Sequence, residues 1–296
     1  MENIKFISNL KGFSGCNIGI YSERGINFVR KISKSKEYNS RLDVQINKQK
    51  NFLEKIANAK ITAPKILRSG CLNGLNYFDM EYIQGVNLVD YIYDAKIPDL
   101  REIAQDIGEI IYMMKNSPKE SEFLDIAAMV KKIETIHSFL LSKKSDLDLN
   151  ILKELKMLIS TINQNTPIQK TFCHGDLTME NIIIDKSKKR YYLIDFLDSF
   201  IEHYWFDIAK LFQDIEGKWY KFRNPHINME NMAPKMDFLN EFFRSQILSE
   251  EPVYNKNHNL FLALNFARII PYAEEKDSGY LVSVIKDNIE KFRGIN

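Results

Sequence analysis

The chain has 296 residues, 45% of them hydrophobic and 27% charged, which is ordinary for a globular protein with one large domain or two lobes. A formal net charge of +2 argues against general binding to nucleic acid or anionic membranes, and three scattered cysteines without a CxxC pair argue against a disulfide framework or zinc site. Without a signal-peptide pattern or a long apolar run, we expect a cytoplasmic protein that does not span a membrane.

The first part of the chain predicts a small lobe rich in strands. A turn rich in glycine at 11–19 separates strands, and another strand follows at 26–33. The next stretch has apolar residues at helical spacing and predicts a helix that ends near Asn58. Asn73-Gly74 predicts a hairpin turn, and residues 77–83 form the strand after it.

After Gly85 the pattern is mainly helical, with Asp99 as an expected N-cap, Pro271 as a helix end, and a second hairpin over 181–195. Helices are expected near 100–114, 123–143, 148–163, 208–215, 235–248, 258–270 and 279–292. We therefore predict an α+β protein with two lobes, a β-rich lobe over 1–83 and a larger helical lobe over 84–296. A cleft between two such lobes is a common place for a ligand.

The segment HGDLTMEN at 174–181 concentrates polar side chains just before an apolar strand. Asp176 and Asn181 are five residues apart, and Asp195 ends the partner strand of the predicted hairpin. Pairing of the two strands brings Asp195 towards Asn181, so a carboxylate and an amide oxygen can share one Mg²⁺. Asp176 is then left to accept a proton from an attacking hydroxyl, as in the D-x4-N loop of kinases. The pattern predicts phosphoryl transfer from ATP.

Each of these residues also has a simpler interpretation, since Asp and Asn often cap turns and strand ends. For a single residue the cap is the better interpretation. The combination of loop, spacing and second acid favours catalysis.

A kinase also needs a cation at the nucleotide phosphates and a loop over them. Lys31 lies on the strand at 26–33, and Arg30 points to the other face by alternation. The turn at 12–17 offers backbone N–H groups, including that of Gly15, and the Ser14 hydroxyl. Taken alone, the turn is only a turn and Lys31 is only a strand lysine.

The lysine of a kinase normally pairs with an acid on the following helix, and this chain has no obvious one. Gln45 and Gln49 stand near the expected place, and either amide oxygen can orient Lys31. Both are equally well explained as polar surface residues. Further along, the strand at 77–83 offers backbone groups of Glu81 and Ile83 to an adenine, and Met80 suits an apolar purine slot or a plain buried strand.

The segments HGDLTMEN and LIDF resemble the aminoglycoside phosphotransferase and choline kinase family, kinase-fold enzymes that phosphorylate small-molecule hydroxyls. MEYIQG (80–85) is similar to the family's hinge, and FVRKIS to its lysine strand. The resemblance implies a protein-kinase-like fold, Asp176 as the base, Asn181 and Asp195 as Mg²⁺ ligands, and Lys31 at ATP. It also implies that His174 and Asp207 brace the loop.

The substrate is less clear, because DFLDSFIEHYW after Asp195 lacks the acid-aromatic pair of choline kinases and differs from the usual aminoglycoside enzymes. It resembles more closely the uncharacterised bacterial members of the family, and this resemblance implies an association with surface polysaccharide. We expect a sugar, an amino alcohol or a related acceptor. An aminoglycoside or choline kinase proper, a non-catalytic nucleotide-binding module and a protein kinase remain alternatives, and the oligomeric state is not predicted.

Several polar and aromatic residues after Asp195 are candidates for binding the acceptor, although each is also explained as core or rim. They are Asp198, Trp205, Trp219, Tyr220, Arg268 and Tyr272.

Overall fold

The computed structural model describes residues 4–10, 15–117, 120–143, 147 and 149–295. The chain divides into two compact units. The first unit comprises Met1–Tyr91, His174–Asp176 and Glu180–Asp198, and the second comprises Ile92–Cys173, Leu177–Met179 and Ser199–Asn296. The lobe boundary between residues 83 and 84 stays a prediction.

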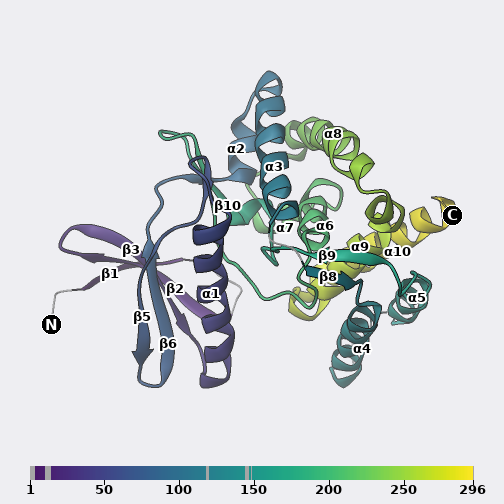
Figure 1. Ribbon diagram of the computed structural model, residues 1–296, viewed down its shortest axis with the longest axis horizontal. Helices are drawn as coiled ribbons and strands as arrows, with labels where there is room; N and C mark the ends of the chain where they lie inside the picture. The colour runs from purple at the N-terminus through teal and green to yellow at the C-terminus, as the bar shows by residue number, and fades with distance from the viewer. Residues whose placement is uncertain (1–3, 11–14, 118–119, 144–146, 148, 296) are drawn as a thin grey trace. The chain divides into compact units, whose positions relative to one another are not determined.

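The first unit contains a five-stranded antiparallel sheet with the order β1-β2-β3-β6-β5 (Figure 1). Its strands are β1 (Lys5–Leu10), β2 (Cys16–Glu23), β3 (Ile26–Ser33), β5 (Ile66–Leu72) and β6 (Leu75–Glu81). The turn between β5 and β6 places Asn73 and Gly74 at φ +52° and +79°, the left-handed conformation that a tight hairpin requires. The predicted Asn73-Gly74 hairpin is confirmed.

One face of this sheet packs against helix α1 (Asn39–Lys55), which follows a 3₁₀ turn at Lys36–Tyr38. The helix ends three residues before the predicted end at Asn58. Side chains from both elements form one apolar core. This core comprises Cys16, Val29, Leu42, Ile46, Phe78 and Met80.

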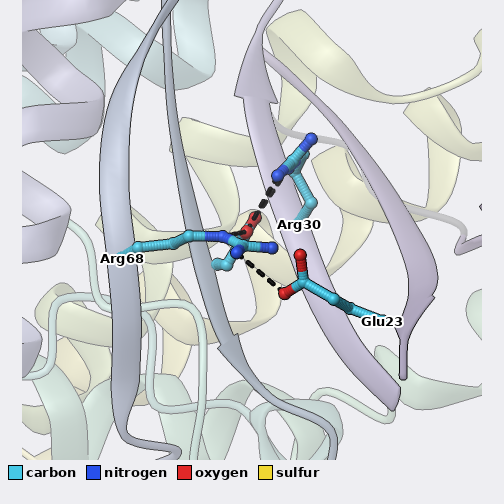
Figure 2. Close-up of polar contacts among 4 residues, drawn as sticks. Glu23, Arg30 and Arg68 are labelled. Atoms are coloured by element: carbon cyan, nitrogen blue, oxygen red, sulfur yellow. Dashed lines mark hydrogen bonds and ion pairs between the residues drawn. The ribbon is translucent and has the colours of Figure 1, made fainter. Parts of the chain in front are cut away.

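The opposite face of the sheet carries a network of charges. Figure 2 shows Arg30 and Arg68 reaching the same carboxylate from β3 and β5, the two strands that flank β6, while Arg68 also contacts Glu23. That carboxylate belongs to Asp79, which is fully buried and accepts hydrogen bonds from Arg30 Nε at 2.6 Å and Nη2 at 2.8 Å. The Arg30 guanidinium also lies 4.5 Å from the Tyr77 ring centroid. Alternation therefore places Arg30 opposite Lys31, as predicted.

A second sheet of the first unit has the order β4-β11-β10-β7. Its strands are β4 (Ile61–Thr62), β7 (Val86–Asn87), β10 (Ile182–Asp185) and β11 (Arg190–Leu193). β10 and β11 form the predicted second hairpin, with Ile182 opposite Leu193. Ile182 and Ile184 are buried, so this hairpin is anchored in apolar packing next to the polar segment that precedes it.

The second unit is mainly helical, with one two-stranded ribbon of β8 (Glu120–Phe123) and β9 (Pro167–Lys170). Helix α2 (Leu88–Asp94) leads into it. Its other helices are α3 (Leu100–Lys115), α4 (Ile126–Ser142), α5 (Asn150–Ile159), α6 (Tyr204–Ile215), α7 (Tyr220–Arg223), α8 (Met229–Gln246), α9 (Pro252–Ile269) and α10 (Glu275–Ile295). Short 3₁₀ turns occur at Ile97–Asp99, Met179–Asn181, Leu248–Glu250 and Ile270–Tyr272. Among the described residues, no helix is both long and apolar enough to cross a membrane.

Three helix boundaries test the predictions in this unit. α9 ends at Ile269, two residues before Pro271, as predicted. α8 starts at Met229 instead of near 235, because Asn228 caps its first turn and the helix tolerates Pro234 inside it. Asp99 directly precedes α3, but its own backbone is already helical and its side chain makes no capping hydrogen bond. Asp99 therefore stands at the predicted N-cap position, but its side chain does not cap the helix.

Candidate functional site

The turn at His174-Gly175-Asp176 has a backbone shape that only glycine permits at its centre. Gly175 has φ +88°, and a Cβ at this position would lie 2.2 Å from the Leu197 carbonyl oxygen. The Leu197 N–H donates to the His174 carbonyl at 3.0 Å. Two backbone segments thus run against each other, and the turn can form because Gly175 has no side chain.

Asp176 and Asn181 lie together in the first unit. The Asn181 Nδ2 donates to the Asp176 carboxylate at 3.1 Å and to the Asp176 carbonyl at 2.8 Å. The Ile194 N–H donates to the Asn181 carbonyl at 3.0 Å. The hairpin therefore brings residue 195 back to Asn181, which confirms the predicted strand pairing.

Asp195 follows β11 in a conformation that is unusual for a residue with a side chain. Its φ is +64°, in the left-handed region, where a non-glycine residue costs about 1–3 kcal/mol and tends to occur at functional sites. Its carboxylate forms an ion pair with Lys31 Nζ. The side chain of Lys31 is nearly fully buried, whereas that of Asp195 is 29% exposed, so solvent reaches the pair from the side of the acid.

The geometry distinguishes the two glutamines on α1. Gln45 Oε1 accepts a hydrogen bond from Lys31 Nζ at 3.4 Å. Gln49 Nε2 instead donates to the Pro64 carbonyl at 2.7 Å and lies 3.9 Å from the Met80 sulfur. Gln45 is therefore the glutamine beside Lys31, and Gln49 ties α1 to the segment before β5.

The remaining predicted nucleotide contacts lie along β6 and the start of β2. Met80 belongs to the apolar core under α1, and the Glu81 N–H donates to the Lys65 carbonyl at 3.0 Å. This pairing engages the backbone amide of Glu81 within the protein. Ile83 is half-buried and lies beyond the end of β6. Gly15 is placed next to the Tyr38 ring, whereas Ser14 lies outside the described residues.

His174 is completely buried beneath this turn. Its ring centroid lies 4.4 Å from that of Phe196, which in turn lies 5.3 Å from Phe52 on α1. Burial lowers the pKa of His174 to about 4, against the opposing effect of the Asp176 charge. The Asp176 N–H donates to His174 Nδ1 at 3.3 Å, as expected for a neutral ring at pH 7.

The oxygen ligands at this turn suit Mg²⁺ only with help from a phosphate group. Among the described residues, no group of three or more His, Cys, Asp and Glu side chains is arranged to hold a metal ion. Mg²⁺ needs fewer protein ligands when phosphate oxygens and water complete its shell. Because the Nδ2 of Asn181 is committed to Asp176, its Oδ1 is the atom left for a cation, and the backbone bond from Ile194 to Asn181 links it to the residue before Asp195, whose carboxylate is partly exposed. This pair of oxygens fits Mg²⁺ in that setting.

The sequence matches the phosphotransferase enzyme family over residues 23–230, more than two thirds of the chain. The chain belongs to this family. The matched stretch contains every residue of the arrangement just described from Lys31 to Asp195, and it confirms the resemblance predicted from HGDLTMEN and LIDF. No curated protein matches the chain.

Solved structures of aminoglycoside phosphotransferase APH(4)-Ia share the fold of this phosphotransferase family member. The apo form of a thermostable mutant has a TM-score of 0.64 at 12% identity, with 97% of this chain and 94% of that chain covered. A ternary complex of such a mutant with ADP and hygromycin B has a TM-score of 0.59 at 12% identity, covering 97% and 93%. At this identity the likeness shows the fold alone, and it confirms the predicted α+β, kinase-like fold.

In this phosphotransferase, the residues predicted to bind an acceptor differ in their exposure and in the partners that they contact. Asp198 is about half exposed and pairs with Arg41 at 3.2 Å. Tyr220 is fully buried with its hydroxyl 3.8 Å from the Met229 sulfur, so it has no face to offer a sugar and that prediction is corrected. Trp219 is half-buried, with its ring centroid 5.0 Å from that of Phe222.

The other three candidates lie on the α6 and α9 side of the second unit. The Arg268 guanidinium lies 5.0 Å from the Phe200 ring and donates to Asn265 Oδ1 at 3.0 Å, while Tyr272 is 79% exposed. Trp205 is almost fully buried, and its Nε1 donates to Glu251 at 3.1 Å. Trp205 is therefore packed within the protein, and its ring face is not exposed for stacking on a sugar.

Two cavities of the second unit adjoin the β8–β9 ribbon. One, of about 600 Å³, is lined by Trp205 and Glu251, among others. Burial alone would raise the pKa of Glu251. Hydrogen bonds from Lys115, Tyr204 and Trp205 instead hold this pKa below its usual value. The other, of about 1010 Å³, is lined mainly by the ends of the ribbon, the start of α4 and residues 199–202. Ser199 Oγ is buried at this second cavity and has no hydrogen-bond partner within the part of the chain that is described.

Sequence reasoning missed four residues that hold the site in place. Lys48 Nζ donates to the Leu197 carbonyl at 2.6 Å, and Phe52 packs on Phe196. Tyr38 contacts Gln45, and Asp214 accepts a hydrogen bond from the Met179 N–H at 2.9 Å, just before Asn181. Of these four residues, only Asp214 could have been noticed in the sequence. It follows Asp207 by seven residues, which places both acids on the same face of α6.

Proposed function

We propose that this protein is an ATP- and Mg²⁺-dependent kinase that transfers the γ-phosphoryl group to a hydroxyl of a small molecule. The observation that carries the proposal is one constellation within the first unit. Asp176 lies 3.1 Å from Asn181, the Asn181 backbone is bonded to the residue before Asp195, and Asp195 pairs with Lys31. These are the parts that phosphoryl transfer requires.

In the proposed reaction, Asp176 orients the acceptor hydroxyl and accepts its proton. The hydroxyl oxygen forms the new bond to the γ-phosphorus, the bond from phosphorus to the β–γ bridging oxygen breaks, and ADP leaves with that electron pair. Lys31 binds the nucleotide phosphates and stabilises the charge that develops on them. Asn181 Oδ1 and Asp195 would hold Mg²⁺, which when bound supplies further positive charge at the phosphates.

The turn geometry supports this assignment of Asp176. The carboxylate is held by Asn181, so it is oriented before a substrate arrives. The buried, neutral ring of His174 accepts the Asp176 N–H and adds no positive charge that would weaken a base. The ADP and AMP-PNP complexes of the APH(4)-Ia structures support a nucleotide as the phosphate donor.

For the acceptor we propose a small molecule with several polar groups. The cavity of about 1010 Å³ in the second unit has a lining of matching chemistry, with the carboxylates of Glu122, Asp125 and Glu202 beside a single lysine, Lys170. Oxygen-rich walls of this kind suit a molecule with several hydroxyl or amino groups. A sugar or an amino alcohol is thus the proposed class, with an aminoglycoside as the alternative.

The proposal is tested by ADP release over a panel of sugars, amino alcohols, nucleosides and aminoglycosides, with mass spectrometry of the product. Asp176→Asn should lower turnover by about 10²-fold or more. Its affinity for Mg·ADP should stay within about threefold of the wild type, because only the proton acceptor is lost.

Asp185→Asn is the matched control, because this carboxylate lies on the same hairpin but contacts only the turn residues Ser187 and Lys188 among the interactions described. Turnover of Asp185→Asn should remain near the wild-type value. Full activity of Asp176→Asn would contradict the assignment, and nucleotide binding without turnover of any acceptor would support a non-catalytic binding module instead.

A further inference from the structure

Tyr38 occupies the junction between β3 and α1 and contacts two parts of the proposed nucleotide site. Its ring lies against the backbone of Gly15, where a Cβ would approach Tyr38 Cδ2 to 2.3 Å. Its hydroxyl accepts a hydrogen bond from Gln45 Nε2 at 3.2 Å. The Arg41 guanidinium lies 5.6 Å from the centroid of the Tyr38 ring.

Gln45 carries this contact on to Lys31. The side chain of Gln45 is 2% exposed, its Nε2 faces Tyr38, and its Oε1 faces Lys31 Nζ. A carboxamide has one donor end and one acceptor end, so it can serve both neighbours only in one orientation. Turned the other way round, it would point an NH₂ group at an ammonium group. The ammonium group of Lys31 therefore decides which end of Gln45 faces it, and the hydrogen bond to Tyr38 holds the carboxamide in that position.

An acid at position 45 would not need this support. Both oxygens of a carboxylate accept hydrogen bonds, so either one can meet Lys31 without a partner that fixes the rotamer. The amide in this chain forms a weaker, neutral contact at 3.4 Å. Because Gln45 is neutral, it does not neutralise the positive charge of Lys31. The ionic partner of Lys31 in this structure is Asp195.

We propose that Tyr38 is a positioning residue, which acts through Gln45 to hold Lys31 for the nucleotide phosphates. The proposal rests on the proposed function, in which Lys31 binds nucleotide. Because the same ring lies against Gly15, Tyr38 also fixes the start of β2 relative to the lysine. The Gly15 carbonyl is held in turn by the Lys34 N–H at 2.9 Å, on the stretch that leads to Tyr38.

A double-mutant cycle on nucleotide affinity tests the chain of contacts from Tyr38 to Lys31. Mg·ADP binding is measured by calorimetry for the wild type, Tyr38→Phe, Gln45→Glu and the double variant. Tyr38→Phe should raise the Kd by roughly threefold to tenfold, since one orienting hydrogen bond is lost. In the Gln45→Glu background the same change should alter the Kd by less than about twofold, because a carboxylate needs no orienting partner.

Tyr21→Phe is the matched control, since it removes a tyrosine hydroxyl from the opposite face of the same sheet. Its Kd should equal that of the wild type. Thermal unfolding of each variant separates lost stability from lost positioning, because a merely structural Tyr38 would weaken binding equally in the wild-type and Gln45→Glu backgrounds.

The outcomes separate this inference from the function on which it rests. An unchanged Kd in Tyr38→Phe, or the same loss in both backgrounds, overturns the positioning role while the kinase assignment stands. If the wild type binds no Mg·ADP, the proposed function fails and the positioning role fails with it.

Discussion

His174 illustrates how one buried side chain links the polar turn to the core. Its ring is fully buried beside Phe196, and the loss of solvent lowers its pKa to about 4. In the unfolded chain a histidine titrates near 6.5. Between these two values the unfolded state binds a proton that the native state does not, so native stability must fall as the pH falls.

We therefore expect the free energy of unfolding to decrease as the pH is lowered from 7 to 4, with His174 contributing roughly 3 kcal/mol of that loss across the window from 6.5 to about 4. Urea unfolding at pH 7, 6 and 5 measures the slope. His174→Gln should be less stable at pH 7 yet show a flatter slope. Equal slopes for the two proteins would mean that His174 is not neutral in the folded state.

Two further residues of this turn show why the local backbone resists substitution. Gly175 at φ +88° faces the Leu197 carbonyl, and Asp195 adopts φ +64° with a side chain in place. The first position is satisfied by glycine at no steric cost, whereas the second stores strain. Strain at an acidic residue next to Lys31 and Asn181 is most simply explained by a requirement on where that carboxylate points.

At the scale of elements, the five-stranded sheet depends on a buried acid. Asp79 on β6 is shared by Arg30 on β3 and Arg68 on β5, at 2.6 Å and 2.5 Å (Figure 2). Asp79→Asn keeps the shape but leaves two guanidinium groups without their carboxylate. We expect it to lower the free energy of unfolding by roughly 2–4 kcal/mol, somewhat less than for a wholly buried pair because Arg68 is partly exposed.

The matched comparison is Glu23→Gln, which removes the other, more exposed carboxylate that contacts Arg68 at 2.8 Å. Its cost should stay within about 1 kcal/mol. Urea unfolding of both variants gives the two values. If Asp79→Asn costs no more than Glu23→Gln, the shared acid does not hold the three strands together.

The elements that could be predicted from sequence are those with a local signal. The pair Asn73-Gly74 predicts a hairpin turn from two adjacent residues alone. The spacing of Asp176, Asn181 and Asp195 likewise identifies the candidate site when the three residues are taken together. The ribbon of β8 and β9 was missed, because ESEF and PIQK pair across more than forty residues and are too short for a clear alternation.

The same distinction applies to single residues. Gln45 and Gln49 are equivalent in the sequence, since both lie on the buried side of α1. What separates them is the partner that each meets, Lys31 for one and the Pro64 carbonyl for the other. Tyr38 and Lys48 are similar cases. The contacts of Tyr38 with Gln45 and of Lys48 with the Leu197 carbonyl exist only in the folded chain. The sequence does not distinguish the buried ring of Tyr220 from the exposed ring of Tyr272, because composition carries no information on burial.

At the scale of the molecule, the two units are interleaved along the chain. The polypeptide passes from one to the other five times, and three of its crossings fall between Cys173 and Glu180. The proposed base at Asp176 belongs to the first unit, whereas the three residues after it belong to the second. We therefore expect the units to unfold together, because disorder in this segment must affect both.

The two tryptophans test this expectation, since the chain has only Trp205 and Trp219 and both lie in the second unit. The proposed nucleotide contacts lie in the first unit, so Mg·ADP is expected to bind there. At about 100 times its Kd it should add about 2.7 kcal/mol to the free energy of unfolding. With cooperative unfolding, the calorimetric transition and the tryptophan fluorescence transition should rise in temperature by the same amount. A calorimetric shift that leaves the tryptophan transition unmoved would show that the second unit unfolds independently, and that interleaving of the chain does not by itself couple the two units.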